Sequence, residues 1–378
     1  MYYLIGGSGA PNYGDELILL QWLRFLHEEV LPRQGGGPVV VDNNSVAGST
    51  TLFGGRYPGV EFVSRFKRVH HDRNKGSFMA NLVYGLGFFS QGHWRQHTEL
   101  SEAVAKLRSA RLVHLYGGGY INTLLSPQSA FLIGLLADAA RSFKIPVAAT
   151  GIGITPLQFA DGEELAPLKQ AIEAFSLFEL RDVVGYNRLR QLTGDAPALL
   201  CGQDDAFLYP VVPQAGSAGL RRLHLSGYRA GNLFERADVQ AWLQRYAPAF
   251  GETVYWECAP KLEQEIVEGL RQHLPELRVA GVDELLFRGP PAHPADHMLA
   301  MRYHPHMVAA RLGVSGQYLA QSVYYEHKHG AVVHWGSRFK RLQGECGPPD
   351  TLDQPLAWRD AGWVALKQAL ARRLYGLA

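Results

Sequence analysis

The chain has 378 residues, of which 47% are hydrophobic and 19% are charged, and its net charge is +2. A chain of this length exceeds one ordinary hydrophobic core, so we expect two domains of roughly 150–200 residues. Charges of both signs are interspersed, which excludes the basic footprint of a nucleic-acid-binding protein.

The sequence predicts no membrane span, because no stretch of 18 residues is entirely apolar. No basic segment followed by an apolar one opens the chain, so no signal peptide is expected either. Three distant cysteines, Cys201, Cys258 and Cys346, favour a reducing cytoplasm over a disulfide framework or a zinc site. We therefore expect a cytoplasmic protein, at most peripheral at the inner face of the membrane.

Apolar segments alternate with segments of helical periodicity along the first 210 residues. The strand candidates are 2–5, 38–42, 60–64, 111–116, 145–150, 176–180 and 197–201. The helix candidates are 16–28, 78–90, 99–109, 129–142, 162–174 and 184–193. Apolar strands separated by helices predict a parallel sheet that is covered on both faces.

A Pro-rich connector, "YPVVPQAGSAG", precedes a second alternating set. Its strand candidates are 221–226, 253–257, 278–281, 297–301 and 317–320, and its helix candidates are 235–246, 261–273 and 305–312. The sequence thus predicts an α/β protein with two Rossmann-like domains facing a cleft, at 1–210 and 220–345. The oligomeric state is not predicted.

The last segment, 350–378, is predicted to be a helix that returns to the N-terminal domain. Trp363, Leu366, Leu370 and Leu374 fall on one helical stripe, which favours packing against that domain. A membrane-surface helix is the alternative, given the basic residues Lys367, Arg372 and Arg373.

The opening segment "GGSGAPNYGDELILL" places glycines and two carboxylates between an apolar strand and a helix. Residues 7–12 lack the third glycine of a dinucleotide-binding loop, although Asp42 stands where its ribose-binding acid would be. No Lys-Ser or Lys-Thr follows, so a P-loop is excluded. Asp15 and Glu16 either complement the helix dipole, worth about 0.3–1 kcal/mol each, or bind a ligand at the strand end.

Two further motifs follow apolar strands. In "LYGGGYIN", Gly117, Gly118 and Gly119 would let the backbone approach a ligand or hold an anion; a tight turn is the alternative. In "ELRDVVGYNRL", Arg181 precedes a helix and would clamp a phosphate or carboxylate, unless it is a surface residue.

Asp204 and Asp205 end another strand in "CGQDDAFL". The pair is expected to cap a helix, with a divalent ion as the alternative. No metal site is predicted, because no cluster of metal-ligand spacing is present.

The second half contributes "MRYHPHMVAARLG" and "SVYYEHKHG". Arg302 and His304 lie two residues apart, so that the arginine could hold an anion beside a general acid or base. Lys328 lies among aromatic and ionisable neighbours.

Taken in order, these motifs resemble those of the polysaccharide pyruvyl transferase family. The matching segments are Asn12-Tyr13-Gly14-Asp15-Glu16, Gly117-Gly118-Gly119, Arg181-Asp182, Asp205-Ala206-Phe207, Arg302-Tyr303-His304 and Tyr325-Glu326-His327-Lys328. The resemblance spans residues 1 to about 330 and implies a two-domain fold of the GT-B type. The His304-Pro305-His306 segment and the histidine-rich "YYEHKHG" depart from the family pattern.

The resemblance implies transfer of pyruvate from phosphoenolpyruvate onto two sugar hydroxyls in polysaccharide biosynthesis, giving a cyclic ketal and phosphate. The catalytic residues would be Asp15, Glu16 and His304. The donor-binding residues would be Asn12, Gly117, Gly118, Gly119, Arg181, Arg302 and Lys328. The acceptor would be a sugar, lipid-linked or nucleotide-linked. No metal is implied, nor any cofactor apart from phosphoenolpyruvate as co-substrate.

Two other functions fit the same sequence. A GT-B glycosyltransferase that uses a sugar nucleotide would share the fold and the basic residues of the second domain. A non-catalytic carbohydrate-binding protein would tolerate loss of Asp15, Arg181 and His304 together. The acceptor and the division of acid and base roles are not predicted.

Overall fold

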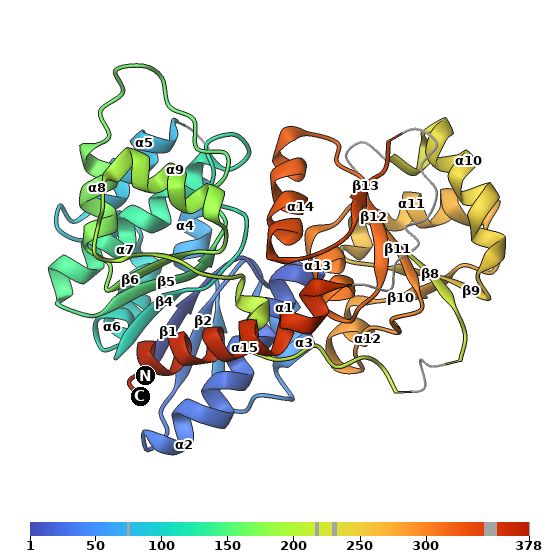
Figure 1. Cartoon of the computed structure of the whole chain (residues 1–378). Helices are drawn as coiled ribbons and strands as arrows, with labels where there is room; N and C mark the ends of the chain where they lie inside the picture. Colours follow the sequence, from blue (N-terminus) through green and yellow to red (C-terminus); the bar gives the residue numbers. More distant parts are fainter. Residues whose placement is uncertain (74–75, 216–218, 229–232, 344–353, 378) are drawn as a thin grey trace. The chain divides into compact units, whose positions relative to one another are not determined.

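The computed structural model describes residues 1–73, 76–215, 219–228, 233–343 and 354–377. The chain divides into two compact units. The first comprises Met1–Ala10, Ile18–Leu208 and Ala365–Ala378, and the second comprises Pro11–Leu17 and Tyr209–Val364. Each unit has its own parallel sheet and helices (Figure 1), which confirms the predicted α/β fold with two Rossmann-like domains.

The first unit contains a seven-stranded parallel sheet in the order β3-β2-β1-β4-β5-β6-β7. Its strands are β1 (Tyr2–Ile5), β2 (Val39–Asp42), β3 (Val60–Val63), β4 (Leu112–Leu115), β5 (Val147–Ile152), β6 (Leu177–Leu180) and β7 (Leu199–Cys201). Every residue of β1, β2, β4 and β5 is buried, so both faces of the sheet centre are covered. The strand order reverses between β1 and β4, which makes this the topological switch point of the unit.

The helices of this part of the chain are α1 (Tyr13–Phe25), α2 (Leu31–Arg33), α3 (Val46–Phe53), α4 (Phe66–Asp72), α5 (Phe78–Leu86), α6 (Ser101–Arg108), α7 (Ala130–Phe143), α8 (Ala166–Glu173) and α9 (Val183–Thr193). The backbones of α5 and α7 approach closely at two glycines. A Cβ on Gly134 would lie 2.2 Å from the Leu82 carbonyl oxygen, and one on Gly85 would lie 2.5 Å from that of Phe131. Glycine is therefore required at this helix crossing.

The second unit contains a six-stranded parallel sheet in the order β10-β9-β8-β11-β12-β13. Its strands are β8 (Arg222–Ser226), β9 (Glu252–Trp256), β10 (Arg278–Ala280), β11 (His297–Ala300), β12 (Ser315–Tyr318) and β13 (Lys340–Arg341). Its helices are α10 (Ala237–Tyr246), α11 (Pro260–His273), α12 (Val282–Phe287), α13 (Tyr303–Arg311) and α14 (Val323–Trp335). The strand order reverses between β8 and β11, which places the switch point of this unit there.

The C-terminal helix α15 (Pro355–Leu374) packs back through its last turns, as predicted. The predicted apolar stripe is not the buried face: Leu366 is 58% exposed, and Val364, Lys367 and Ala371 are buried instead. Lys367 is fully buried, and its Nζ lies 2.6 Å from Asp205 Oδ1 and 3.0 Å from the Gln203 carbonyl oxygen. Lys367 also pairs with Glu179. The residue is thus an internal cation and does not belong to a membrane-facing surface.

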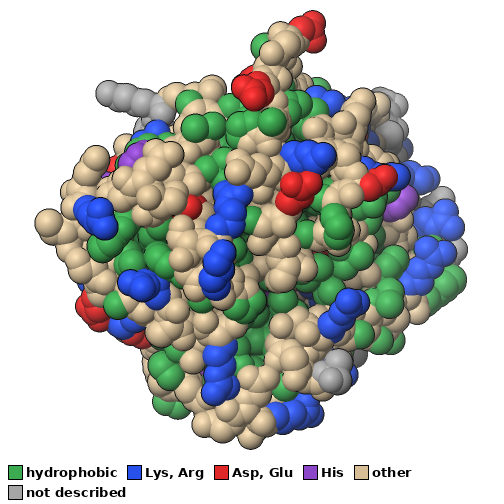
Figure 2. Space-filling model, turned by 90° about the vertical axis from the view of Figure 1, so that its left-hand side faces the viewer, with side chains coloured by type: hydrophobic (Ala, Val, Ile, Leu, Met, Phe, Trp, Pro, Cys, Tyr) green, Lys and Arg blue, Asp and Glu red, His purple; other side chains and the backbone are tan. Residues whose placement is uncertain are grey.

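None of the helices in the described part of the chain combines the length and the apolar character needed to cross a bilayer. Figure 2 shows one face of the molecule with its side chains coloured by type. Among the described residues on this face, uncharged atoms separate the Lys and Arg side chains, so they form no continuous basic patch there.

His297, the first residue of β11, is a buried histidine that stays neutral. Its ring stacks on Trp242 with 5.7 Å between the centroids, and its Nδ1 lies 3.3 Å from Ser315 Oγ. Burial, helped by the positive charge of Arg221, lowers the pKa of His297 from 6.5 to about 3. The unfolded chain therefore takes up a proton below pH 6.5 that the folded chain does not bind.

The folded state should lose stability at this residue as the pH falls through 6.5. Between pH 7 and pH 5 the loss from His297 alone is about 2 kcal/mol. The variant His297→Phe cannot titrate at this position. Its free energy of unfolding, measured with urea at pH 7 and pH 5, should therefore fall by about 2 kcal/mol less than that of the wild type. Equal declines in the two proteins would contradict this interpretation.

Candidate functional site

The candidate site lies at the carboxyl edge of the second sheet, beside the switch point between β8 and β11. Open α/β sheets bind ligands in the crevice that forms where neighbouring connections leave in opposite directions. Gly227 and Tyr228 follow the end of β8, and Met301 and Arg302 follow the end of β11. These four residues mark the switch point at the ends of the two strands.

Arg302 connects the ends of these two strands. Its Nε donates a hydrogen bond to the Gly227 carbonyl oxygen at 2.7 Å, and its guanidinium lies 4.6 Å from the centre of the Tyr228 ring. The same guanidinium forms an ion pair with the fully buried Glu263 of α11. Glu263 balances the charge of Arg302, and the arginine holds the ends of β8 and β11 together. Its predicted role in binding the donor substrate stays a prediction.

Two helices begin at this edge. Helix α13 follows Arg302 directly, and α14 follows Ser322 at the end of the loop after β12. Neither N-cap side chain forms a capping hydrogen bond. Helix α14 has Glu326 in its first turn, which offsets its dipole, whereas the first turn of α13 carries no acidic residue. The dipole of α13 therefore favours an anionic ligand at this edge.

An aromatic and cationic group lies on α14. Lys328 Nζ lies 4.2 Å from the centre of the Tyr324 ring and 5.5 Å from that of Tyr325. The rings of Tyr325 and Tyr228 are 5.3 Å apart. Burial and the neighbouring Tyr228 raise the pKa of Tyr325, so its hydroxyl stays protonated at neutral pH. Such a group can pair with a phosphate and stack on a planar ring.

The opening segment Pro11–Leu17 belongs to this unit and brings the carboxylate pair with it. The Tyr13 amide donates to the Cys258 carbonyl oxygen at 2.8 Å, which attaches the segment to the end of β9. A Cβ on Gly14 would lie 1.8 Å from His304 Nδ1, so Gly14 makes room for the imidazole. The structure thus places the segment that carries Asp15 and Glu16 against His304.

The two carboxylates differ in their surroundings. Asp15 is partly exposed in the first turn of α1, and its Oδ2 accepts a hydrogen bond from Asn12 Nδ2 at 2.7 Å. Glu16 is fully buried. The predicted donor-binding Asn12 therefore orients Asp15, and Asp15 is the carboxylate that a ligand could reach.

The remaining predicted residues lie in the first unit. The Gly117 amide donates to Asp205 Oδ2 at 2.8 Å, and Gly118 has a φ of +149° that favours glycine. Arg181 is only 3% exposed, and its Nη1 lies 3.2 Å from Asp204 Oδ2. The glycine triplet and the arginine are thus built into the strand ends of the first sheet, and their donor-binding roles stay predictions.

The acids considered in this unit have structural partners. Asp42 accepts hydrogen bonds from the backbone amides of Arg65, Phe66 and Lys67 and so caps α4. Asp204 Oδ1 accepts from the Ala206 amide at 3.0 Å, which is the capping role expected of the aspartate pair. Asp42 does not act as the ribose-binding acid of a dinucleotide site.

Sequence reasoning missed Gly227, Tyr228 and Glu263. For Gly227 and Tyr228 the available signal was the glycine in "LHLSGY". It directly follows the first strand of the second domain, where ligands of α/β folds are bound. Nothing in the sequence around Glu263 distinguishes it from the other acidic residues of α11, because its partner Arg302 is 39 residues away.

No protein-family model matches the chain, and no curated protein does. Solved structures match over nearly the whole length. A UDP-N-acetylglucosamine 2-epimerase matches with a TM-score of 0.54 and 13% identity, covering 99% of this chain and 90% of its own. UDP-GlcNAc 2-epimerase from Neisseria meningitidis, bound to UDP-GlcNAc, matches with a TM-score of 0.52 and 13% identity, covering 100% and 96%. Anabaena HepE in complex with UDP matches with a TM-score of 0.51 and 15% identity, covering 99% and 95%.

At these identities the likeness shows the fold, which is GT-B-like. The predicted membership of the polysaccharide pyruvyl transferase family is wrong, since the similar structures are UDP-GlcNAc 2-epimerases and HepE. Phosphoenolpyruvate as co-substrate and pyruvyl transfer as the activity are withdrawn with it. The short motifs misled because the fold needs several of them for packing: Gly14 leaves space for His304, Gly117 contacts Asp205, and Arg181 pairs with Asp204.

Proposed function

We propose that the chain is a sugar-nucleotide-dependent glycosyltransferase with a GT-B-like fold. The observation that carries the proposal is that α13 begins at the end of β11, while Tyr325 of α14, beside Lys328, lies 5.3 Å from Tyr228 at the end of β8. A nucleoside diphosphate is a compact anion attached to a planar base. The dipole of α13 and the Lys328 ammonium would hold the diphosphate, and the Tyr228 and Tyr325 rings would offer a stacking surface.

Uridine nucleotides are the first candidates for the donor. Among the similar structures, HepE is in complex with UDP and the Neisseria epimerase is bound to UDP-GlcNAc. In transfer, the bond between the sugar's anomeric carbon and the β-phosphate oxygen breaks, and an acceptor hydroxyl oxygen bonds to that carbon. The hydroxyl proton must go to a base, and the electron pair stays with UDP.

Asp15 and His304 are the candidates for that base. Asp15 is partly exposed and is oriented by Asn12, while His304 is held against Gly14. A positioned base of this kind typically contributes 10²–10⁴-fold to the rate. Glu16 is fully buried, so it would help to position Asp15 and would not contact the substrate itself.

Epimerisation at the sugar's second carbon is the second candidate, because several of the similar structures are UDP-GlcNAc 2-epimerases. Both reactions consume the same donor. Proton NMR of a reaction with UDP-GlcNAc separates them: epimerisation inverts the second carbon of a sugar that stays attached to UDP, whereas transfer moves the sugar onto an acceptor and releases free UDP.

Binding is tested first, by thermal unfolding with UDP, UDP-GlcNAc and UDP-glucose. A nucleotide at about 100 times its dissociation constant should stabilise the protein by about 2.7 kcal/mol. The variant Lys328→Met should bind UDP at least about tenfold more weakly, because an ammonium–phosphate contact is lost. Lys261→Met, which removes an exposed lysine at the start of α11, is the matched control and should bind like the wild type.

Absence of stabilisation by all three nucleotides would contradict the proposal. So would equal loss of binding in both variants, which would indicate a general charge effect. A protein that only binds carbohydrate would instead be stabilised by free sugars and would leave the nucleotides unbound.

A further inference from the structure

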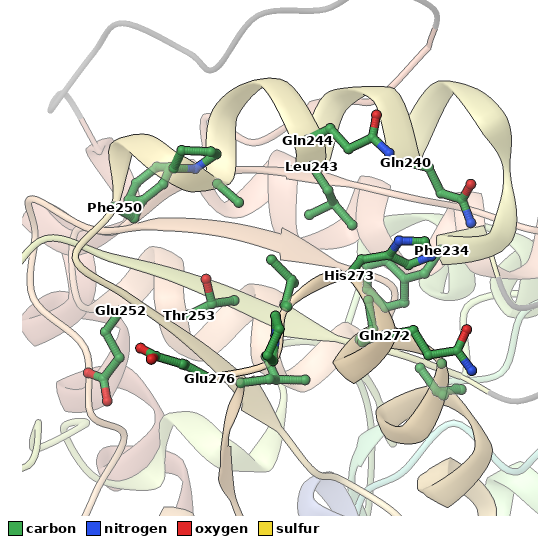
Figure 3. Close-up of a pocket in the computed structure, with 18 of the residues that line it drawn as sticks. Phe234, Gln240, Leu243, Gln244, Phe250, Glu252, Thr253, Gln272, His273 and Glu276 are labelled. Carbon is green, nitrogen blue, oxygen red and sulfur yellow. The ribbon is translucent and has the colours of Figure 1, made fainter.

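The second unit contains a cavity of about 810 Å³ between α10 and α11 (Figure 3). Glu252 and Thr253, the first two residues of β9, line it. The proposed nucleotide site lies at the opposite, carboxyl end of the same sheet. The volume lies within the range of about 300–1,000 Å³ that is typical of small-molecule sites.

The floor of the cavity is aliphatic. It is formed by Leu243 of α10, by Ile266 and Leu270 of α11, and by Leu277 in the segment after α11. Each of these side chains is at most 5% exposed and belongs to the hydrophobic core of the unit. An apolar group bound here would extend that core and leave water, which is the main source of affinity in such sites.

Gly269 of α11 also lines the cavity, together with Ile266, Leu270 and His273 of the same helix. A Cβ built on Gly269 meets no heavy atom within 4 Å. Glycine in a helix interior costs about 1 kcal/mol relative to alanine, and close packing does not require it at this position. The absence of a side chain at 269 keeps the cavity open.

The rim of the cavity is acidic. Its ionisable lining residues are Glu235, Glu252, His273 and Glu276, with no Lys or Arg among the described residues that line it. Arg222 Nε lies 2.6 Å from Glu252 and balances it, and the Arg221 guanidinium lies 4.7 Å from the centre of the lining Phe250 ring. The exposed Glu276 is therefore the carboxylate on which the charge of this end depends. In Figure 3, Glu252 and Glu276 lie toward one end of the cavity, and Gln240 and Gln272 lie toward the other. A carboxylate rim repels anionic ligands and attracts cationic ones.

We propose that this cavity binds a small amine with an apolar body. The apolar body would cover Leu243, Ile266 and Leu270, and the ammonium group would lie at the end of the cavity that carries Glu276. The charge of the rim disfavours nucleotides and other phosphates, so the site differs in chemistry from the proposed donor site. The proposal does not depend on the reaction that the donor site performs.

Three compounds of equal size test the charge rule on the full chain: 4-phenylbutylamine, 4-phenylbutanol and 4-phenylbutyrate. Isothermal titration calorimetry should give the tightest binding for the amine, with the carboxylate weaker by at least about tenfold. Glu276→Gln should reduce the difference between the amine and the alcohol. Equal affinity for amine and carboxylate, or no binding of any of the three, would overturn the proposal.

Two glycine variants test the location. Gly269→Leu places a side chain into the cavity and should abolish amine binding, while thermal unfolding shows that the protein remains folded. Gly362→Leu is the matched control, because Gly362 is an exposed glycine of α15 whose Cβ also meets nothing within 4 Å. Unchanged amine binding in Gly269→Leu would overturn the assignment. UDP titrations of both variants report on the donor site separately.

Discussion

Replacement of Lys367 by methionine is expected to lower the free energy of unfolding by about 3–5 kcal/mol, as for other buried ion pairs that lose one partner. Lys367 Nζ lies 2.6 Å from Asp205 Oδ1 and also pairs with Glu179, and all three side chains are fully buried. Burial raises the pKa of Glu179, and the Lys367 ammonium opposes that effect. Without the ammonium, two carboxylates would remain in the interior with no cation to balance them.

Asp205 also connects this ion pair to other elements of the first unit. Its Oδ2 accepts hydrogen bonds at 2.8 Å each from the Gly117 amide, Thr150 Oγ1 and Trp22 Nε1. One carboxylate therefore joins α15 to the glycine turn after β4, to β5 and to α1. Loss of Lys367 should loosen the glycine turn as well as the C-terminal helix.

Urea unfolding monitored by circular dichroism measures the effect. Arg373→Met is the control on the same helix, and since Arg373 is exposed its replacement should change stability by less than about 0.5 kcal/mol. The double variant Lys367→Met with Glu179→Gln should recover part of the loss, because it removes one of the two buried charges. If Lys367→Met lowers the free energy of unfolding by less than about 1 kcal/mol, the buried ion pair contributes little to stability.

The second large effect is expected from Gly14→Ala, which should lower turnover of the sugar nucleotide by about 100-fold while leaving the protein folded. A Cβ at this position would lie 1.8 Å from His304 Nδ1 and 2.5 Å from His304 Cε1. The imidazole must therefore move by more than thermal motion allows in a packed site. If His304 acts as a base, the displaced ring no longer reaches the acceptor hydroxyl.

UDP release with UDP-GlcNAc measures the loss, and the NMR signals of the His304 ring report its displacement independently of any activity. Gly330→Ala is the matched control, because a Cβ on this helical glycine of α14 meets nothing within 4 Å. Turnover within twofold of the wild type in Gly14→Ala would show that the position of His304 does not matter to the reaction. A displaced ring with no turnover in the wild type would count against the proposed function and leave the geometry intact.

Strands were predicted best where both faces of a sheet are covered. The expected strand 2–5 coincides with β1, and the expected strand 297–301 differs from β11 by one residue. Both strands are entirely buried, and apart from His297 at the start of β11 they consist of apolar or aromatic residues. The edge strand β13, Lys340–Arg341, is short and exposed and carries no such signal.

Helix α14 was not predicted, although it carries Lys328 and Tyr325. Its buried positions include His329 as well as Tyr324, Ala331, Val332 and Trp335, so a polar residue interrupts the apolar stripe. His329 can be buried because its Nδ1 lies 2.9 Å from His306 Nδ1 of α13. That partner is 23 residues away, and no local pattern indicates it.

The sequence by itself determined the fold class and the strand ends that carry polar residues, because apolar periodicity and glycine turns are local properties of the chain. Only the tertiary structure decided which of these residues meet. It placed the Asp15 segment against His304, paired Arg302 with Glu263, and brought Lys367 to Glu179 across 188 positions of sequence. Ion pairs and close contacts between distant residues follow from how the elements pack, and a short motif that serves this packing in many α/β proteins does not identify a reaction.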